Sequence, residues 1–333
     1  MRETEFSARG GAAELSRRAV LGAALGLVAN AASAQEAWPS RPGRVVVPYP
    51  AGGATDVMGR FAAEALSQAT GRRFIIENKG GASGAIGTAN VANAPADGHS
   101  FLVATPATHV TNQFLREKLP YDPEAFEPVI MLSRSPMLLI AKSSLPANSV
   151  AELVALAKKQ PGKLNYGSSG VGATSHLAPE LFKKMADLDI AHVPYRGAGP
   201  AMTDLIGGQV DLMFDNVQTA LPQVEANKVK LLGVTSAERL SSLPNVPTIA
   251  ETLPGYEALS FLALMVRKGT QPVVIGRANG IVSAFFQAPD VMAKLAALGV
   301  EFAPNTPAEL DGFLGREREK WGALIKERGL KAE

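Results

Sequence analysis

Cysteine is absent from the sequence. Disulfide bridges, thiolate metal sites and cysteine nucleophiles are therefore excluded, whatever the redox state of the compartment. Histidine is scarce, and the four histidines (His99, His109, His176 and His192) do not have the spacing of metal ligands. We therefore expect neither a metal nor another cofactor.

A large excess of charge is also absent, because 33 Lys and Arg against 31 Asp and Glu leave a formal net charge of +2. This balance argues against nucleic acid or an anionic membrane surface as a partner. Beyond residue 34, no segment approaches the ~18 consecutive apolar residues of a membrane span. With 46% hydrophobic residues, the chain can still bury the core of one large domain or of two ordinary ones.

Residues 1–34 have the organisation of an export signal peptide. Ser16-Arg17-Arg18 precedes an apolar stretch over 19–29, and small residues at 32–34 form a cleavage site. The arginine pair is twin-arginine-like but lacks the usual Phe and Lys, which leaves the route open between twin-arginine export and general secretion. A lipoprotein leader would need a cysteine, so we expect a periplasmic protein that is free of the membrane after removal of residues 1–34.

Strand-like and helix-like segments alternate from Trp38 onward. Strands are predicted at 44–47, 74–77, 100–104, 164–166, 190–193, 210–214 and 230–235, and helices at 55–69, 87–94, 150–159, 175–185 and 200–206. This alternation predicts an α/β fold with parallel sheets covered by helices on both faces.

Two short apolar runs, 137–141 and 261–266, bracket the middle third of the chain. If both cross between two lobes, the chain leaves the first lobe, builds the second and returns. We therefore expect a first lobe built from 35–138 and 263–333, and a second lobe from 139–262. A C-terminal helix with Phe313, Trp321, Leu324 and Ile325 is expected to pack on the first lobe.

Two similar loops, Gly53-Ala54-Thr55-Asp56 and Gly172-Ala173-Thr174-Ser175, each open a predicted helix after a strand. Free N–H groups and the helix dipole attract an anion to such a position, and glycine lets a ligand approach the backbone closely. Hydroxyls that can donate to a carboxylate or cap the helix come from Thr55, Ser168, Ser169, Thr174 and Ser175. Each loop alone also fits an ordinary N-cap. Together they predict a site for a small carboxylate that needs no buried cation.

Other kinds of site are less well supported by the sequence. The glycine turns lack the G-x-G-x-x-G and P-loop spacings, which argues against a nucleotide. The alternative enzyme is an exported serine hydrolase using Ser169 and His176. Val171 stands where the motif G-x-S-x-G requires glycine, and His176 more naturally caps its helix or lines a pocket.

Two charged residues also allow two interpretations each. Arg196 suits either a carboxylate clamp or a solvated ion pair. Asp215 follows a predicted strand, where open α/β sheets contact ligands, but it could equally cap the next helix.

Longer motifs carry a resemblance to a known family. They include V-V-P-Y-P-A-G-G-A-T-D, E-N-K-G-G-A-S-G-A-I-G, L-N-Y-G-S-S-G-V-G-A-T-S-H-L, H-V-P-Y-R-G and L-P-N-V-P-T-I-A-E, in this order along the mature chain. The sequence resembles the Bug-type periplasmic receptors of tripartite tricarboxylate transporters. The resemblance implies a two-lobed, type II flytrap fold with two crossover strands. It also implies a monomeric receptor, not an enzyme, that closes on a small organic acid and passes it to membrane permease subunits. A receptor that serves a membrane sensor would look the same.

The resemblance also implies which residues bind the carboxylate, through N–H groups, hydroxyls and water. The first loop is matched by Tyr49, Pro50, Ala51, Gly52, Gly53, Ala54, Thr55 and Asp56. The second loop is matched by Ser168, Ser169, Gly170, Val171, Gly172, Ala173 and Thr174, with His176 just inside the helix. Thr105 and Asp215 are implied to shape the distal part of the pocket.

Three segments depart from the family pattern: Phe261-Leu262-Ala263, Arg267-Lys268-Gly269-Thr270-Gln271 and Asp97-Gly98-His99. The family usually has Trp-x-Gly, Pro-x-Gly-Thr-Pro and Asp-Gly-Tyr there. The first departure affects the expected pocket shape near the hinge, and the second affects the flexibility of the return segment. The ligand is therefore left open among di- or tricarboxylates, amino acids and aromatic acids.

Overall fold

Strands and helices alternate through most of the chain in a computed structural model that describes residues 38–297, 300 and 302–332. The chain divides into a unit of residues Met1–Ser40 and a unit of residues Arg41–Glu333, and everything below concerns the second unit. The predicted signal peptide lies outside the described residues. Among these residues, no helix is both long and apolar enough to pass through a bilayer.

The strands of the described residues join in one sheet, in the order β2-β1-β3-β9-β4-β7-β5-β6, with β8 also paired to β4. They are β1 (Gly43–Val47), β2 (Phe74–Asn78), β3 (Ser100–Ala104), β4 (Phe126–Lys142), β5 (Asn165–Ser168), β6 (Ala191–Pro194), β7 (Leu212–Asn216), β8 (Val229–Val234) and β9 (Leu259–Arg267). Their positions agree with the predicted strands to within two residues, apart from the two crossing strands.

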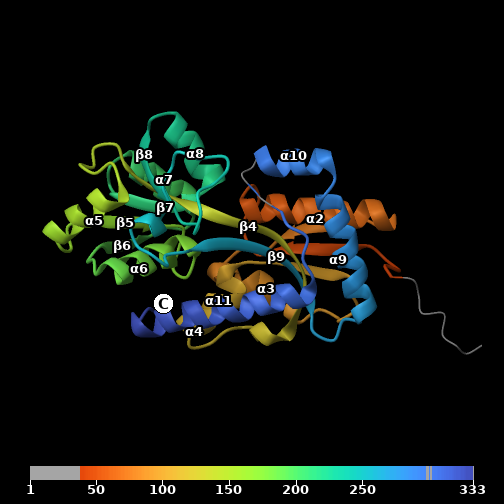
Figure 1. The fold of residues 1–333 in the computed structure, drawn as a ribbon. Coiled ribbons are helices and arrows are strands. Elements are labelled where there is room, and N and C mark those ends of the chain that lie inside the picture. The colour runs from red at the N-terminus through yellow and green to blue at the C-terminus, as the bar shows by residue number, and fades with distance from the viewer. Residues whose placement is uncertain (1–37, 298–299, 301, 333) are drawn as a thin grey trace, which may run out of the picture. The chain divides into compact units, whose positions relative to one another are not determined.

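The strands β4 and β9 run side by side between two groups of elements (Figure 1). The first half of β4 pairs with β9, while its second half, from Met137, pairs with β7 and β8. We call the part around β1, β2 and β3 the first lobe, and the part around β5, β6, β7 and β8 the second lobe. The sheet is continuous across both lobes. The predicted lobe boundaries at 138/139 and 262/263 therefore stay predictions.

The prediction of wholly parallel sheets is wrong. Parallel pairing joins β1 to β2 and β3, and β5 to β6 and β7, but β9 is antiparallel to β3 and β4, and β4 is antiparallel to β7 and β8. The two crossing strands carry the chain out of the first lobe and back, so they run in opposite directions. The strand β4 also begins at Phe126, well before the predicted run over 137–141. The sequence does not predict this first half because Pro128 and Pro136 interrupt the apolar pattern.

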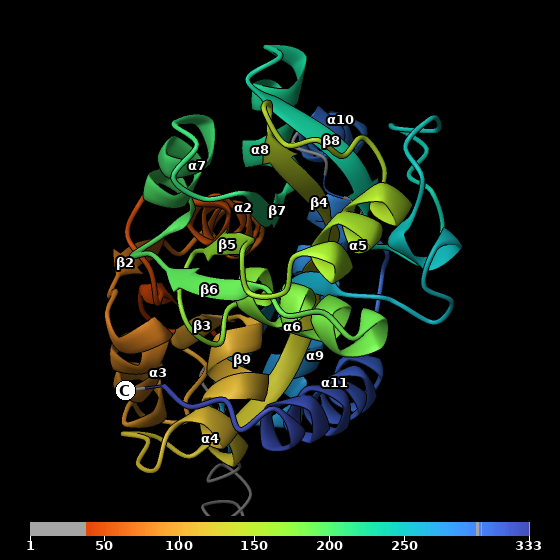
Figure 2. The same ribbon diagram turned by 90° about the vertical axis from the view of Figure 1, so that its left-hand side faces the viewer.

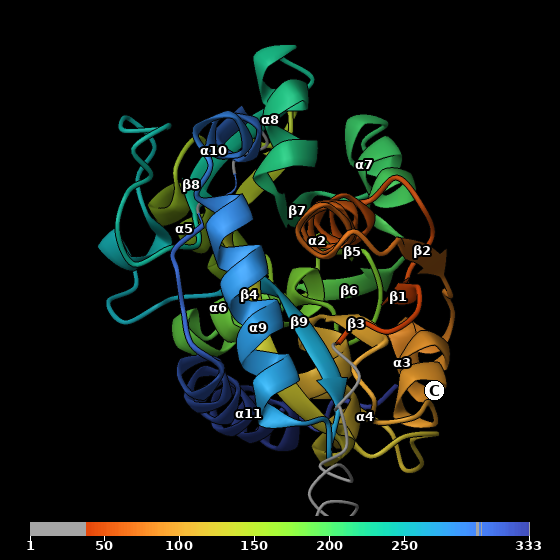
Figure 3. The same ribbon diagram turned by 90° about the vertical axis from the view of Figure 1, so that its right-hand side faces the viewer.

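The helices of the described residues are α2 (Ala54–Thr70), α3 (Ala85–Ala92), α4 (Asn112–Leu115), α5 (Val150–Lys159), α6 (Thr174–Ala186), α7 (Ala198–Ile206), α8 (Val217–Glu225), α9 (Pro272–Phe286), α10 (Pro289–Ala297) and α11 (Pro307–Glu327). Short helical turns lie at Ala82–Gly84, Ala107–Thr111, Pro123–Ala125 and Ile249–Glu251. Figures 2 and 3 show these helices around the sheet from its two ends.

Helix α11 illustrates how the apolar pattern becomes packing. Phe313, Trp321, Leu324 and Ile325 are buried, as the spacing predicts, and the Phe313 ring meets Phe261 of β9 edge to face at 5.2 Å. The helix packs on β4 and on the segment that ends in α4 (Figure 2). It also contacts α6 of the second lobe, which the sequence does not predict.

Candidate functional site

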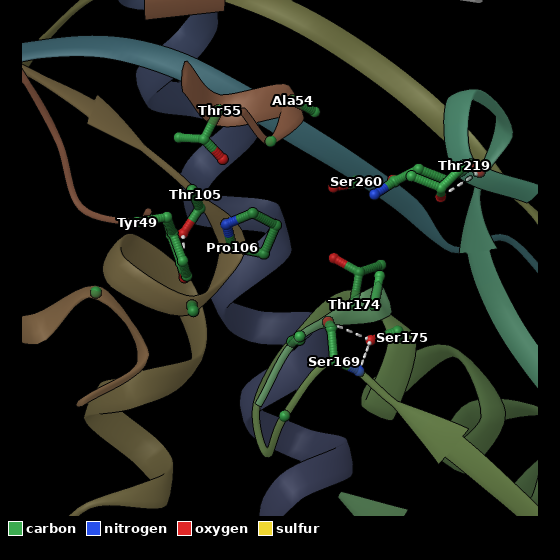
Figure 4. A pocket seen from close by; sticks show the side chains of 18 of the residues that line it. Tyr49, Ala54, Thr55, Thr105, Pro106, Ser169, Thr174, Ser175, Thr219 and Ser260 are labelled. Carbon is green, nitrogen blue, oxygen red and sulfur yellow. Dashed lines mark hydrogen bonds between the residues drawn. The ribbon is translucent and has the colours of Figure 1, made fainter. Parts of the chain in front are cut away.

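A cavity of about 920 Å³ lies where loops of both lobes meet β4 and β9 (Figure 4). The first lobe contributes the turns before α2 and α3 and the residues after β3. The second lobe contributes the turns before α6, α7 and α8. Ser133, Ser135 and Met137 of β4, with Ser260 and Leu262 of β9, complete the wall.

Most of the predicted binding residues line this cavity. They are Tyr49, Ala51, Gly53, Ala54, Thr55, Thr105, Ser169, Gly170, Val171, Ala173, Thr174 and Asp215. The remaining predicted residues, Gly52, Asp56, Ser168, Gly172 and His176, are not part of the lining. The structure gives these five a supporting place instead.

Asp56 holds the first loop in shape. Its carboxylate accepts hydrogen bonds from Gly52 N (3.0 Å), Arg60 Nε (3.0 Å) and Asn78 Nδ2 (3.0 Å). Burial alone would raise the pKa of Asp56, but these hydrogen bonds outweigh it and hold the pKa below its usual value. The charge of Asp56 is therefore satisfied within the protein, and we correct its predicted position in the lining.

His176 and Ser168 support the second loop from behind. The Nδ1 atom of His176 accepts from Gly172 N at 3.1 Å, and its ring stacks on His192 at 4.1 Å. The Ser168 hydroxyl lies 2.7 Å from His192 Nε2 and accepts from Gly170 N at 3.2 Å. Burial lowers the pKa of His176 to about 4 and that of His192 to about 3, so both rings are neutral at neutral pH.

Gly172 is needed for packing between the lobes. Its φ is +82°, and a Cβ there would lie 2.5 Å from Leu115 Cδ1. The Thr111 hydroxyl donates to Gly172 O at 2.8 Å. The sequence predicts a close approach of a ligand at this glycine, whereas the structure shows a close approach of the first lobe.

The geometry does not support the serine hydrolase alternative. The Ser169 hydroxyl lies 2.7 Å from Ser175 Oγ, and Ser169 N also donates to Ser175 Oγ at 3.0 Å. His176 instead uses its Nδ1 atom for Gly172 N. Ser169 therefore has no histidine partner to act as a base.

The helices that begin at the cavity share one property: their starts lack side-chain caps. The N-cap residues of α2, α6, α7 and α8 are Gly53, Ala173, Gly197 and Asn216, and none of them accepts a hydrogen bond through its side chain. Away from the cavity, Ser149 caps α5 and Thr306 caps α11 through their hydroxyls.

Two of these starts offer free hydrogen-bond donors to the cavity. Among the described residues, the backbone N–H groups of Ala54 and Thr55 on α2 have no acceptor, and neither do those of Thr174 and Ser175 on α6. The hydroxyls of Thr55 and Thr174 point into the same region (Figure 4). Free N–H groups at a helix start are suited to bind an anion.

Several lining residues were not predicted. Ser133 and Ser135 are two residues apart on β4, so both side chains face the cavity. This spacing could have indicated them, but this half of β4 is not predicted from the sequence. Leu262, in one of the segments that depart from the family pattern, lines the cavity, while its neighbour Phe261 packs on α11. Arg196 lines the cavity with an exposed side chain.

Asp215 and Arg196 are the charged residues of the lining in the described part of the chain. Asp215 is 1% exposed and accepts hydrogen bonds from the Thr219 hydroxyl and from the backbone of Asn216. Burial raises the pKa of Asp215 to about 6, against the opposing effect of these hydrogen bonds. Asp215 lies near the carboxyl end of β7 and lines the cavity, whereas the alternative that it caps α8 is wrong, since Asn216 is the N-cap.

Two lobes joined by two long strands, with helix starts from both lobes around one cavity, define a two-lobed α/β binding protein. A family model described as "Tripartite tricarboxylate transporter family receptor" matches residues 58–330. The chain belongs to this family of periplasmic solute receptors, which confirms the predicted family and fold class.

Relatives and solved structures agree with this membership. The chain is 38% identical over 326 residues to the UPF0065 protein in the tcbD-tcbE intergenic region of Pseudomonas sp. (strain P51), covering 96% of this chain and 97% of the relative. It is 32% identical over 299 residues to protein BugT of Bordetella pertussis, with 89% and 92% covered.

Two solved structures contain carboxylates. Rpa4515 of R. palustris with adipate has a TM-score of 0.82 at 38% identity, with 88% of this chain and 99% of that chain covered. MatC of Rhodopseudomonas palustris with bound malate has a TM-score of 0.78 at 31% identity, with 86% and 100% covered.

Proposed function

We propose that this protein is a periplasmic receptor that captures a small organic carboxylate between its two lobes. The observation that carries the proposal is the pair of uncapped helix starts, α2 and α6, whose free N–H groups line one cavity. The carboxylates bound by Rpa4515 and MatC support the ligand class. The binding residues are the predicted ones that line the cavity, with Gly52, Asp56, Ser168, Gly172 and His176 supporting them.

The free hydrogen-bond donors at the starts of α2 and α6 contribute directly to the binding free energy of a carboxylate. A hydrogen bond to a charged group contributes about 1.5–3 kcal/mol. The N–H groups of Ala54, Thr55, Thr174 and Ser175, with the hydroxyls of Thr55 and Thr174, offer several such bonds to one carboxylate. Micromolar affinity needs about 8 kcal/mol after the costs of association, so these bonds supply a part of the binding free energy and burial of the rest of the ligand supplies the remainder.

We further propose how the receptor is exported and what it serves. Residues 1–34 direct export and are removed, and the first lobe (35–138 and 263–333) closes with the second lobe (139–262) around the acid. The closed receptor then delivers the acid, as a monomer, to the permease subunits of a tripartite tricarboxylate transporter. A membrane sensor that recognises the same closed form is the alternative partner.

The ligand class is tested by thermal unfolding of the mature protein, residues 35–333, with a panel of organic acids and their neutral amides. At 100 times its Kd, a ligand stabilises the fold by about 2.7 kcal/mol, which raises the Tm by about 4–5 °C at this chain length. We expect at least one acid to do so and its amide to have no effect. Stabilisation by neutral solutes, with none from any acid, would disprove the proposal. Mass spectrometry of the acid that co-purifies would identify the ligand.

A further inference from the structure

We propose that Asp215, acting through Thr219, makes the far end of the cavity a hydrogen-bond acceptor and so selects the second functional group of the ligand. The receptor then prefers a monocarboxylate whose other end donates hydrogen bonds, such as a hydroxyl or an ammonium group, over a fully ionised dicarboxylate. This inference rests on the proposed function and specifies its ligand.

The first observation concerns the helix starts. Among the described helices that begin at the cavity, α8 differs from α2, α3, α6 and α7 because Asp215 lies directly before its N-cap. The carboxylate accepts from the Asn216 backbone and from the Thr219 hydroxyl, and both donors belong to the start of α8. The buried carboxylate of Asp215 therefore lies beside the start of α8, bonded to the N–H group of the N-cap residue and to Thr219.

The second observation is the direction of the Thr219 hydroxyl. Its possible acceptors are Asp215 Oδ2 and, at 3.1 Å, Asn216 O. When the hydroxyl hydrogen is donated to either of these protein oxygens, the lone pairs of Thr219 remain for a ligand. Thr219 and Ser260 lie on the opposite side of the cavity from Tyr49 and Thr105 (Figure 4).

The third observation is the balance of charge. The far wall contains the buried carboxyl of Asp215, and the described lining offers no buried cation, since the side chain of Arg196 is exposed. No charged neighbour contributes to the shifted pKa of Asp215, whose causes are burial and the hydrogen bonds from Thr219 and Asn216. A second ligand carboxylate would thus face a like charge, whereas a hydroxyl or an ammonium group would face acceptors.

The experiment compares ligands that differ only in their far end. We would measure Kd by calorimetry at pH 8 for adipate, 6-hydroxyhexanoate and 6-aminohexanoate, and for succinate, 4-hydroxybutyrate and 4-aminobutyrate. In the series whose length fits, we expect the hydroxy or amino acid to bind at least tenfold more tightly than the dicarboxylate.

Two variants test the residues themselves. Asp215→Asn keeps the size of the side chain and an acceptor for Thr219, and we expect it to tighten dicarboxylate binding at least tenfold and weaken amino-acid binding at least tenfold. Thr219→Val, which keeps the Asp215 carboxylate, should abolish the preference for the hydroxy acid. The control Asp211→Asn removes an acid that pairs with Lys142 outside the lining, and the order of the ligands should not change.

The outcomes separate this proposal from the proposed function. A dicarboxylate that binds the natural protein as tightly as its hydroxy analogue overturns the selection, as does an Asp215→Asn change that affects all three ligands equally. Binding of other acids, but of no member of either series, also overturns the selection and leaves the receptor function intact. Failure of every acid in the wider panel refutes the proposed function itself.

Discussion

At the scale of single residues, Gly53 and Gly172 show that similar motifs serve different purposes. Both stand in a G-A-T sequence before a helix. Gly53 has a φ of −86°, and a Cβ there would have no heavy atom within 4 Å. Gly172 has a φ of +82° and lies against Leu115. One glycine therefore borders open space, and the other is required by packing.

We predict that Gly172→Ala destabilises the fold by about 1–2 kcal/mol, mainly through left-handed backbone strain, because the end of the Leu115 side chain can move away from the new Cβ. The matched variant Gly53→Ala should change the free energy of unfolding by less than about 0.5 kcal/mol. Chemical denaturation of both variants measures the difference. Equal stabilities of the two variants would contradict this account of Gly172.

Buried histidines predict a loss of stability in acid. Burial lowers the pKa of His109 to about 3 and that of His176 to about 4, while the unfolded chain takes up these protons near pH 6.5. Stability should therefore fall as the pH decreases from 6.5 towards 4, by about 1.4 kcal/mol per pH unit for each histidine. Asp215 acts in the opposite direction between pH 6 and 4, because its folded pKa is raised.

The measurement is the free energy of unfolding between pH 7.5 and 4. In His176→Gln, which keeps an acceptor for Gly172 N, the slope should decrease by about one proton. A stability that is constant from pH 7 to pH 4.5 in the natural protein would show that these rings are not kept neutral.

At the scale of elements, the helices are divided by where they begin. Those that start at the cavity have no side-chain cap, whereas α5 and α11 are capped by Ser149 and Thr306; away from the cavity, α4 and α9 are uncapped as well. Relative to serine or aspartate, the alanine N-cap of α6 loses about 1 kcal/mol of stability, and the glycine N-cap of α2 loses a few tenths of a kcal/mol. The cavity thus keeps donors free at the expense of local stability.

Placing a carboxylate on one of these starts tests this relation. We predict that Gly53→Asp raises the stability of the empty protein by a few tenths of a kcal/mol and weakens binding of the identified acid at least tenfold, because the new side chain occupies the N–H groups of α2. Ser149→Asp, which exchanges one good cap for another on α5 away from the cavity, is the control, with neither effect. Thermal unfolding and calorimetry provide the two readouts, and unchanged affinity in Gly53→Asp would exclude α2 from the site.

The sequence predicts the elements well where their local pattern is complete. Helix 150–159 and strand 100–104 match the structure residue for residue, since each has regular apolar spacing and a clear start. The strand β4 was half missed because its prolines interrupt the pattern, and antiparallel pairing requires knowledge of which distant strand lies beside it. The two loops of the site are predicted from their glycine-containing motifs before helices. The sequence does not show that Asp56 and His176 lie outside the lining, because this depends on their contacts with Arg60 and His192.

At the scale of the whole unit of residues Arg41–Glu333, the end of α11 joins the two lobes. Arg328 Nε donates to Glu180 Oε2 of α6 at 3.2 Å, and Glu180 also accepts from Tyr166 and Lys183. Glu180 is 2% exposed, so this cluster is well removed from water. Because α6 begins at the cavity, the C-terminal end of the chain helps to hold the binding loop in place.

We predict that Arg328→Ala lowers the free energy of unfolding by about 1 kcal/mol, a small value because Arg328 is partly exposed and Glu180 keeps two partners. Binding of the acid should weaken about two- to fivefold, since α6 is held less firmly. Lys331→Ala, a change of an exposed lysine three residues later, is the control for both measurements. Unaltered stability and affinity in Arg328→Ala would show that the contact between α11 and α6 is incidental.

The use of backbone N–H groups at the cavity has an evolutionary consequence. Every amino acid except proline carries this donor, so most substitutions in the loops before α2 and α6 leave the carboxylate contacts available. The path of the main chain then sets the preference for a negatively charged ligand. A few side chains, such as Leu262, Asp215 and Thr219, set which acid binds. Descendants of one receptor can therefore change from one acid to another by a few mutations and still recognise acids.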